Sequence, residues 1–216
     1  MSEKSFARDA EKLLRRRAAD ILRDFPQEAR ARHWHPNGFA VFHLGEIAGL
    51  GRLRFHVWPR GLRVPLEGQP AIHSHPWALF SLVIVGYYKD IIYRVRRFDV
   101  DAPGRLRGFD IRFGRADEGD HVYPIAAWYD VTITEERIVP EGHIHQVPAG
   151  VVHETPIALD ACVATLLVTS AATDPGKLLL IGDSAFGERT YRRPQISDAQ
   201  LAYIMEDLNR MVASRP

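Results

Sequence analysis

Short β-rich segments fill the middle of the chain, and a helical pattern occurs near each end. In residues 5–24, apolar side chains recur at helical spacing among many charged ones, which predicts an amphipathic helix. Pro26 is expected to end this helix, because proline disfavours helical dihedral angles in the residue before it. Near the other end, Ser197 and Gln200 have the spacing of a capping box, which predicts that a second helix begins there.

Between these helices, runs of β-branched and aromatic residues alternate with Gly, Pro and Asp. The runs have the length and composition of strands: FAVFHLG, RLRFHVWP, ALFSLVIVG, YYKDIIYRVRRF, IAAWYDVTITEE, HIHQVP and CVATLLVTS. No helix-length amphipathic pattern interrupts them, which argues against a parallel βαβ sheet. The pattern therefore predicts an antiparallel sandwich, jelly roll or small barrel.

Composition excludes several classes of function. The formal net charge of the 216 residues is +1 at pH 7, which argues against a strongly basic nucleic-acid-binding surface. The single cysteine, Cys162, cannot form an internal disulfide, so the fold does not require an oxidising compartment. Residues 1–17 lack the apolar stretch of a secretion signal, and no apolar run approaches the roughly 20 residues of a membrane span. We therefore expect a cytoplasmic protein that binds neither nucleic acid nor a membrane.

Histidines are concentrated in two short windows. Of the 10 histidines, two lie in residues 73–75 and three in residues 143–153. His73 and His75 are two positions apart, so on a strand both imidazoles point to the same face, with Cα atoms about 6.6 Å apart. Such a pair is able to bind one metal ion, but it also suits two half-buried polar residues.

The second window has the form of a strand, a tight turn and another strand. Residues 142–153 read GHIHQVPAGVVH, with Pro148 and Gly150 at the turn and His153 at the start of the next strand. Glycine adopts backbone dihedral angles that other residues resist, which suits such a turn. The turn would bring a third imidazole back toward a pair on a neighbouring strand.

Together the two windows resemble the motifs of the cupin superfamily, which are G-x5-H-x-H-x3,4-E-x6-G and G-x5-P-x-G-x2-H-x3-N. The second motif matches at every position except the last, where Ile157 replaces Asn. The first matches at its histidine pair and at its closing glycine, Gly86, whereas Gly68 lies one residue too close to be the opening glycine. The resemblance covers residues 40–170.

The resemblance implies a mainly β fold with a single cupin domain, an antiparallel β-barrel or jelly roll. We expect this barrel at residues 39–182, with a helical segment before it at residues 1–38 and another after it at residues 183–216. The terminal helices lie outside the resemblance, and a homodimer formed through them is one possibility.

The first motif departs from the family at its glutamate. Leu79 or Phe80 stands at that position, and the first carboxylate after the histidine pair is Asp90. The resemblance therefore implies a divalent metal ion held by three neutral ligands, His73, His75 and His153. An ion without a carboxylate ligand keeps its full charge, which favours anionic or chelating substrates. Fe(II) is the expected ion, because cupins with three histidines include thiol dioxygenases, but imidazole ligands also suit Cu, Ni, Zn or Mn.

Several further side chains are candidates for catalysis or substrate binding. His145 forms a second H-x-H pair with His143, and each of them either adds or orients a metal ligand, acts as an acid or base, or is a polar residue at a strand end. Tyr93 is either a catalytic hydroxyl or an ordinary core tyrosine. Arg54 and Arg94 lie in the middle of predicted strands, where each either faces solvent or binds a substrate carboxylate.

Two classes of function fit these residues. The first is a mononuclear non-haem Fe(II) oxygenase or dioxygenase that acts on a small anionic substrate with O2. A metal-dependent lyase or isomerase would use the same ion, with His145 or Tyr93 moving the proton. The second class is a non-catalytic cupin that binds a small ligand or a metal. The segment CVATLLVTS lacks the histidine and tyrosine of the Ser-His-Tyr relay that thiol dioxygenases often use, so the substrate stays open.

Overall fold

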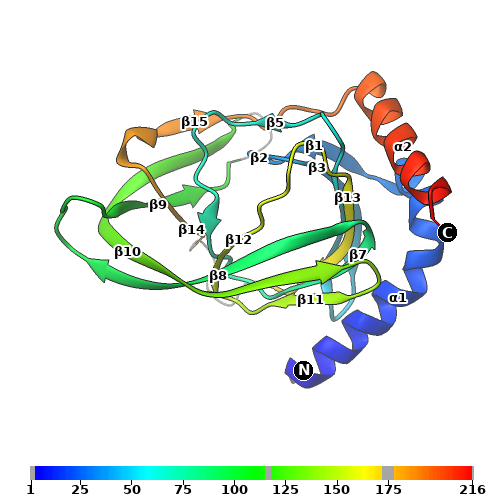
Figure 1. Ribbon diagram of the computed structural model, residues 1–216, viewed down its shortest axis with the longest axis horizontal. Coiled ribbons are helices and arrows are strands. Elements are labelled where there is room, and N and C mark those ends of the chain that lie inside the picture. The colour runs from blue at the N-terminus through cyan, green and yellow to red at the C-terminus, as the bar shows by residue number, and fades with distance from the viewer. Residues whose placement is uncertain (1–2, 115–117, 172–177, 216) are drawn as a thin grey trace.

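Antiparallel sheets and two terminal helices form the fold in the computed structural model, which describes residues 3–114, 118–171 and 178–215 (Figure 1). The helices are α1 (Glu3–Glu28) and α2 (Asp198–Ala213), with a short 3-10 helix at Ser184–Phe186. The strands are β1 (Ala31–Trp34), β2 (Asn37–Gly38), β3 (Ala40–Ile47), β4 (Gly51–Trp58), β5 (Val64–Pro65), β6 (Ile72–His73), β7 (Leu79–Val85), β8 (Tyr87–Phe98), β9 (Leu106–Arg112), β10 (Asp120–Pro140), β11 (Ile144–Val147), β12 (Val152–Glu154), β13 (Val163–Thr169), β14 (Leu179–Gly182) and β15 (Arg189–Tyr191).

Two large sheets face each other across the interior. One has six strands in the order β1-β3-β4-β13-β7-β11, and the other has seven in the order β15-β10-β8-β12-β6-β14-β9. In the second sheet β9 also pairs with β10, so the strands from β10 through β9 form a closed ring of hydrogen-bonded neighbours. All the named strand pairs are antiparallel, and the predicted mainly β fold with helices at both ends is confirmed.

Both predicted helices are present, but Pro26 does not end the first one. Helix α1 continues through Pro26 to Glu28, and the amide of Ala29 still donates to the carbonyl oxygen of Phe25, at 3.0 Å. Phe25, in the last turn of this helix, is fully buried in the core. Packing of this side chain outweighs the tendency of a residue that precedes proline to avoid helical dihedral angles. At α2, Ser197 and Gln200 form the predicted capping box. None of the described helices combines the length and the apolar character needed to cross a lipid bilayer.

Strands outside residues 39–182 also join the sheets. Strand β1 pairs with β3, and β15 pairs with β10. Their sequences, ARHW and RTY, are too short for a period-two pattern to show, and only their pairing partners identify them as strands.

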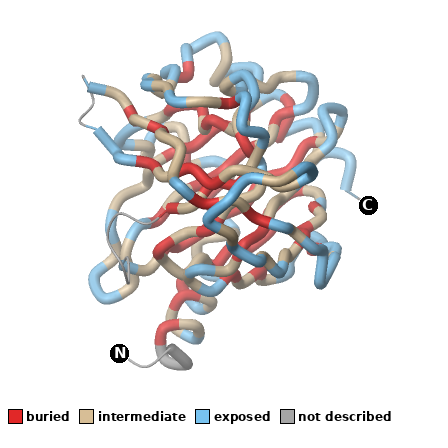
Figure 2. Tube along the Cα trace, turned by 90° about the vertical axis from the view of Figure 1, so that its left-hand side faces the viewer, coloured by how far each residue is buried: buried red, intermediate tan, exposed pale blue. Residues whose placement is uncertain are grey.

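The two faces of the six-stranded sheet differ in chemistry. Its outer face packs against α1 and α2, which lie on one side of the molecule (Figure 1), and forms the main apolar core with fully buried residues such as Phe42, Phe55 and Leu166. Its inner face carries polar side chains, among them His43, Arg54 and Thr165, from the alternate positions of the same strands. Figure 2 shows buried backbone through the centre of the molecule and exposed segments around it. A polar interior face is where a binding site is expected.

Candidate metal centre

Three predicted ligands, His73, His75 and His153, meet inside the barrel. His73 ends β6 and lies directly opposite His153 of β12, and His75 follows two residues later. The ring centroids are 4.6 Å apart for His73 and His75, 4.7 Å for His73 and His153, and 5.3 Å for His75 and His153. One nitrogen of each ring lies within 4.8 Å of one nitrogen of each of the others. The two histidine windows of the sequence therefore form a single cluster that could hold a metal ion.

The hydrogen bonds of these rings leave nitrogens free for a metal ion. Nδ1 of His73 lies 2.7 Å from the carbonyl oxygen of Ala71, and Nδ1 of His153 lies 3.0 Å from a carboxylate oxygen of Asp90, which leaves Nε2 of both rings. Nε2 of His153 and Nδ1 of His75 are buried without a partner. Buried polar atoms normally have partners, so these nitrogens indicate a missing ligand. A tetrahedral ion with bonds of about 2.1 Å holds its nitrogens about 3.4 Å apart, which small ring rotations would achieve. The residues fit a divalent ion.

The environment keeps two of the three rings, His73 and His75, neutral. Burial, together with the nearby His153, lowers the pKa of His73 to about 3. Burial also lowers the pKa of His75 well below its ordinary value, and the neighbouring histidines add to this effect. Metal ions bind neutral imidazole, so these rings need not lose a proton at neutral pH to bind one.

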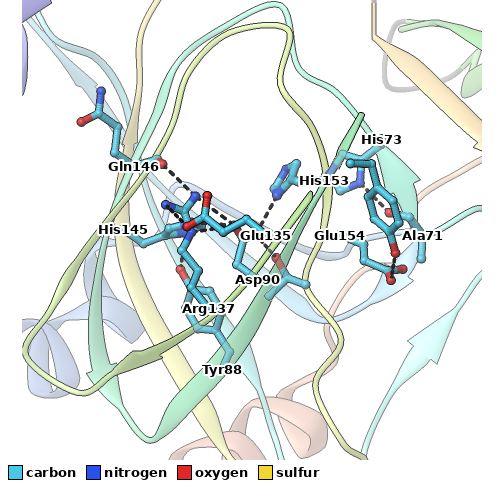
Figure 3. Close-up of polar contacts among 12 residues, drawn as sticks. Ala71, His73, Tyr88, Asp90, Glu135, Arg137, His145, Gln146, His153 and Glu154 are labelled. Carbon is cyan, nitrogen blue, oxygen red and sulfur yellow. Dashed lines mark hydrogen bonds and ion pairs between the residues drawn. The ribbon is translucent and has the colours of Figure 1, made fainter. Parts of the chain in front are cut away.

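Asp90 places a carboxylate near the three-histidine cluster, where it contacts the candidate ligand His153 from behind instead of taking the position of the motif's glutamate (Figure 3). Its side chain is fully buried, with Oδ1 3.0 Å from Nδ1 of His153 and Oδ2 3.0 Å from Nε2 of His145. Arg137 lies 3.1 Å from Oδ2, and the hydroxyl of Tyr88 lies 2.6 Å from Nδ1 of His145. Burial alone would raise the pKa of Asp90, but the hydrogen bonds with His145 and His153 outweigh it and hold this pKa well below its usual range. An ionised carboxylate on the far nitrogen orients a metal-binding imidazole and increases its basicity.

Sequence reasoning did not identify this role of Asp90. The available signal is an aspartate within a strand, flanked by apolar and aromatic residues in YYKDIIY. The contact with His153 depends on the pairing of β8 with β12, in which His153 lies opposite Ile92. That pairing joins segments about 60 residues apart, and the local pattern does not specify it.

The other predicted side chains are divided between the interior and the surface. Both ring nitrogens of His145 have partners, so this histidine presents no free nitrogen to the centre. The hydroxyl of Tyr93 donates to the carboxylate of Glu154, and Tyr93 does not line the cavity described below. Arg94 is exposed on β8, and His143 is exposed as the polar strand-end alternative requires. The catalytic roles of His145, which lines the cavity, and of Tyr93, and the substrate-binding role of Arg94, stay predictions.

Arg54, in contrast, faces a large cavity that also contains the three histidines. The cavity has a volume of about 1750 Å³ and lies between the two sheets. Nε of Arg54 is buried without a partner, and no carboxylate of the described residues pairs with this side chain. Burial, with the nearby charges of Arg52 and Arg193, lowers the pKa of Arg54 to about 10, so it remains a cation at neutral pH. Arg54 and His75 line the same cavity, and the charge of Arg54 contributes to the low pKa of His75.

The antiparallel sheets, the two motifs and the three-histidine cluster resemble the arrangement of a cupin with a metal site. No model of a known protein family matches the chain, and no curated protein matches it. Among solved structures, it is similar to a DMSP lyase from Ruegeria pomeroyi DSS-3, with 15% identity, a TM-score of 0.38, and coverage of 71% of this chain and 57% of that one.

Two further solved structures cover more of the chain. An RmlC-like cupin from Ralstonia eutropha JMP134 aligns with 12% identity and a TM-score of 0.37, over 88% of this chain and 87% of that one. A cupin-like protein from Thermotoga maritima MSB8 aligns with 13% identity and a TM-score of 0.35, over 81% and 91%. The aligned region spans only 57% of the DMSP lyase from Ruegeria pomeroyi DSS-3, and only 51% of the chain in a second solved DMSP lyase structure.

Proposed function

We propose that this protein is a metal-dependent enzyme, a mononuclear Fe(II) oxygenase that acts on an anionic substrate. The observation that carries the proposal is the presence of three clustered imidazoles and an unpaired guanidinium in one cavity. An ion held only by neutral ligands keeps its full charge and attracts an anion, and Arg54 adds a second positive charge in the same cavity.

Each residue has a defined task in this proposal. His73, His75 and His153 would hold the ion, and a ferrous ion would supply the activation of O2 and of the substrate. Asp90 keeps Nε2 of His153 directed into the cluster. The planar guanidinium of Arg54 would bind the substrate anion through two parallel hydrogen bonds, which fixes its orientation. A dioxygenase reaction transfers both atoms of O2 to the substrate, so it needs no separate reductant.

A specific side chain favours a metal-dependent lyase or isomerase as the second candidate. The hydroxyl of Tyr191 is buried without a partner, and Tyr191 lines the same cavity. Burial raises its pKa to about 12, so the hydroxyl keeps its proton at neutral pH and is able to donate it to a substrate. In this reaction Tyr191 would take the proton-transfer role that the sequence suggests for His145 or Tyr93.

Reconstitution tests the proposal and separates its alternatives. The protein would be loaded anaerobically with Fe(II), analysed for bound metal, and then mixed with thiols and carboxylic acids in an oxygen electrode. One iron per chain and substrate-dependent O2 consumption would support the oxygenase. Product formation without O2 consumption, suppressed in Tyr191→Phe, would favour the lyase or isomerase. Bound metal without turnover would indicate a binding protein, and failure to bind any divalent metal would overturn the metal centre.

A further inference from the structure

One strand presents a row of different side chains to the cavity. Arg54, His56 and Trp58 are alternate residues of β4, and all three line the cavity. The residues that alternate with them point to the outer core and are almost fully buried: Leu53, Phe55 and Val57. Alternate residues of a strand are about 6.6–6.8 Å apart, so β4 offers a cation, a polar ring and an aromatic ring in sequence.

The polar members of this row have buried atoms without hydrogen-bond partners. Nε of Arg54 and Nε2 of His56 are both buried without a hydrogen bond, and His56 as a whole is only 9% exposed. Burial lowers the pKa of His56 well below its ordinary value, so the ring is neutral. Leaving buried polar atoms without partners costs free energy, which a ligand that bonds to them would recover.

The charge near Arg54 is suited to a single anionic group. Two other arginines lie close to it, and each faces a carboxylate: Arg52 is 3.6 Å from Glu46, and Arg193 is 2.8 Å from Asp120. Arg54 has no such partner among the described residues, so the row has one uncompensated positive charge. A planar guanidinium matches the two oxygens of a carboxylate, which carries one negative charge.

The other end of the row is aromatic. Trp58 stacks on Phe39 with ring centroids 4.4 Å apart, and Phe39 also stacks on His35 at 4.3 Å. These rings line the same cavity as Arg54. They give this end of the cavity a surface of aromatic rings, against which a planar or apolar group packs well.

The cavity is too large for a very small acid. Its volume of about 1750 Å³ exceeds the roughly 300–1,000 Å³ that is typical of sites for drug-sized ligands. An acid of a few carbon atoms would fill little of it and would leave the aromatic wall in contact with water. A ligand with a body that extends beyond its anionic group would fill more of this cavity.

We propose that the β4 row binds a carboxylate that carries an aromatic or other planar apolar body. The carboxylate pairs with Arg54, a polar group next to it bonds to His56, and the body packs against Trp58 and Phe39. The inference rests on the proposed function and deepens it, because it replaces a small anion with a larger carboxylic acid whose charged end lies in the same cavity as the metal centre.

Calorimetric titration of the metal-loaded protein with three matched probes tests this subsite. The probes are 3-phenylpropionate, its uncharged amide 3-phenylpropionamide, and propionate, which lacks the aromatic body. We expect 3-phenylpropionate to bind at least about tenfold more tightly than either of the others. Arg54→Gln would remove the preference for the carboxylate over the amide, and Trp58→Leu would reduce the preference for the phenyl group. Arg96→Gln, which changes an exposed arginine of β8, would alter neither preference.

Equal affinities for 3-phenylpropionate and its amide in the unmodified protein would overturn the inference without any variant. An unchanged carboxylate preference in folded Arg54→Gln would also overturn it. Arg54→Lys keeps the charge but not the planar fork, and an intermediate preference is expected. Repeating the titrations in His73→Ala separates the two proposals: a preference that persists without bound metal supports the subsite, whereas failure of the unmodified protein to bind metal counts against the proposed function alone.

Discussion

Two histidine pairs with the same H-x-H spacing have different environments in this protein. His73 and His75 both line the cavity and contribute to the cluster with His153. His143 lies outside β11 and is exposed, whereas His145 is 4% exposed and has partners on both ring nitrogens. The spacing alone therefore does not make a metal site. What distinguishes the first pair is that its free nitrogens converge with that of a third ring.

The largest expected effect comes from removing one histidine of each pair. His73→Ala removes a candidate metal ligand, and we expect metal affinity to fall by at least about 100-fold. Even loss of a residue that only hydrogen-bonds to a ligand typically reduces metal affinity about 10- to 100-fold. His143→Ala should bind metal as the unmodified protein does. Competition with a chromophoric chelator measures both affinities. A comparable loss in His143→Ala would show that the two pairs are not functionally distinct.

The carboxylate behind His153 is expected to have the next largest effect. Asp90→Asn retains the shape of the side chain but removes the charge that faces His153 and His145, so metal affinity should fall by about 10- to 100-fold. Asp130→Asn, at an exposed carboxylate on β10, is the matched control. The same chelator assay reports the result, with circular dichroism to confirm folding. Unchanged affinity in folded Asp90→Asn would show that Asp90 does not orient the ligand.

The sequence could predict the three candidate metal ligands but not the residues that hydrogen-bond to those ligands. His73, His75 and His153 lie in short motifs whose local geometry, a strand pair and a tight turn, is encoded within a few residues. The antiparallel, mainly β fold and its terminal helices follow from equally local periodicity, whereas the choice of a single barrel comes from the resemblance to cupins. The partners of Asp90, and the choice between Arg54 and Arg94, depend instead on which strands pair and which face points inward. A shift of one residue in register exchanges the two faces, and the sequence of one strand does not determine its register.

Acid sensitivity extends the comparison to a third H-x-H pair, His33 and His35. Burial, with Arg193 and His43 nearby, lowers the pKa of His33 to about 3, below the value of about 6.5 in an unfolded chain. The unfolded chain therefore takes up a proton before the folded one, and stability falls as the pH decreases from about 6.5 toward 3. Urea unfolding of metal-free protein at pH 7.5 and 5.0 should show this loss. His33→Gln should lose less stability between these pH values than the unmodified protein, and an equal loss would show that His33 does not contribute.

The smallest expected effect concerns two adjacent tyrosines. Tyr88 is buried, with its hydroxyl 2.6 Å from Nδ1 of His145, whereas Tyr87 is 65% exposed. Tyr88→Phe would leave a ring nitrogen of His145 buried without a partner, so the free energy of unfolding should fall by about 1–2 kcal/mol. Tyr87→Phe should change it by less than about 0.5 kcal/mol. Urea unfolding at pH 7.5 measures both. Equal effects would show that the hydroxyl of Tyr88 does not stabilise His145, and the second histidine pair would then lack the fixed position that sets it apart from the first.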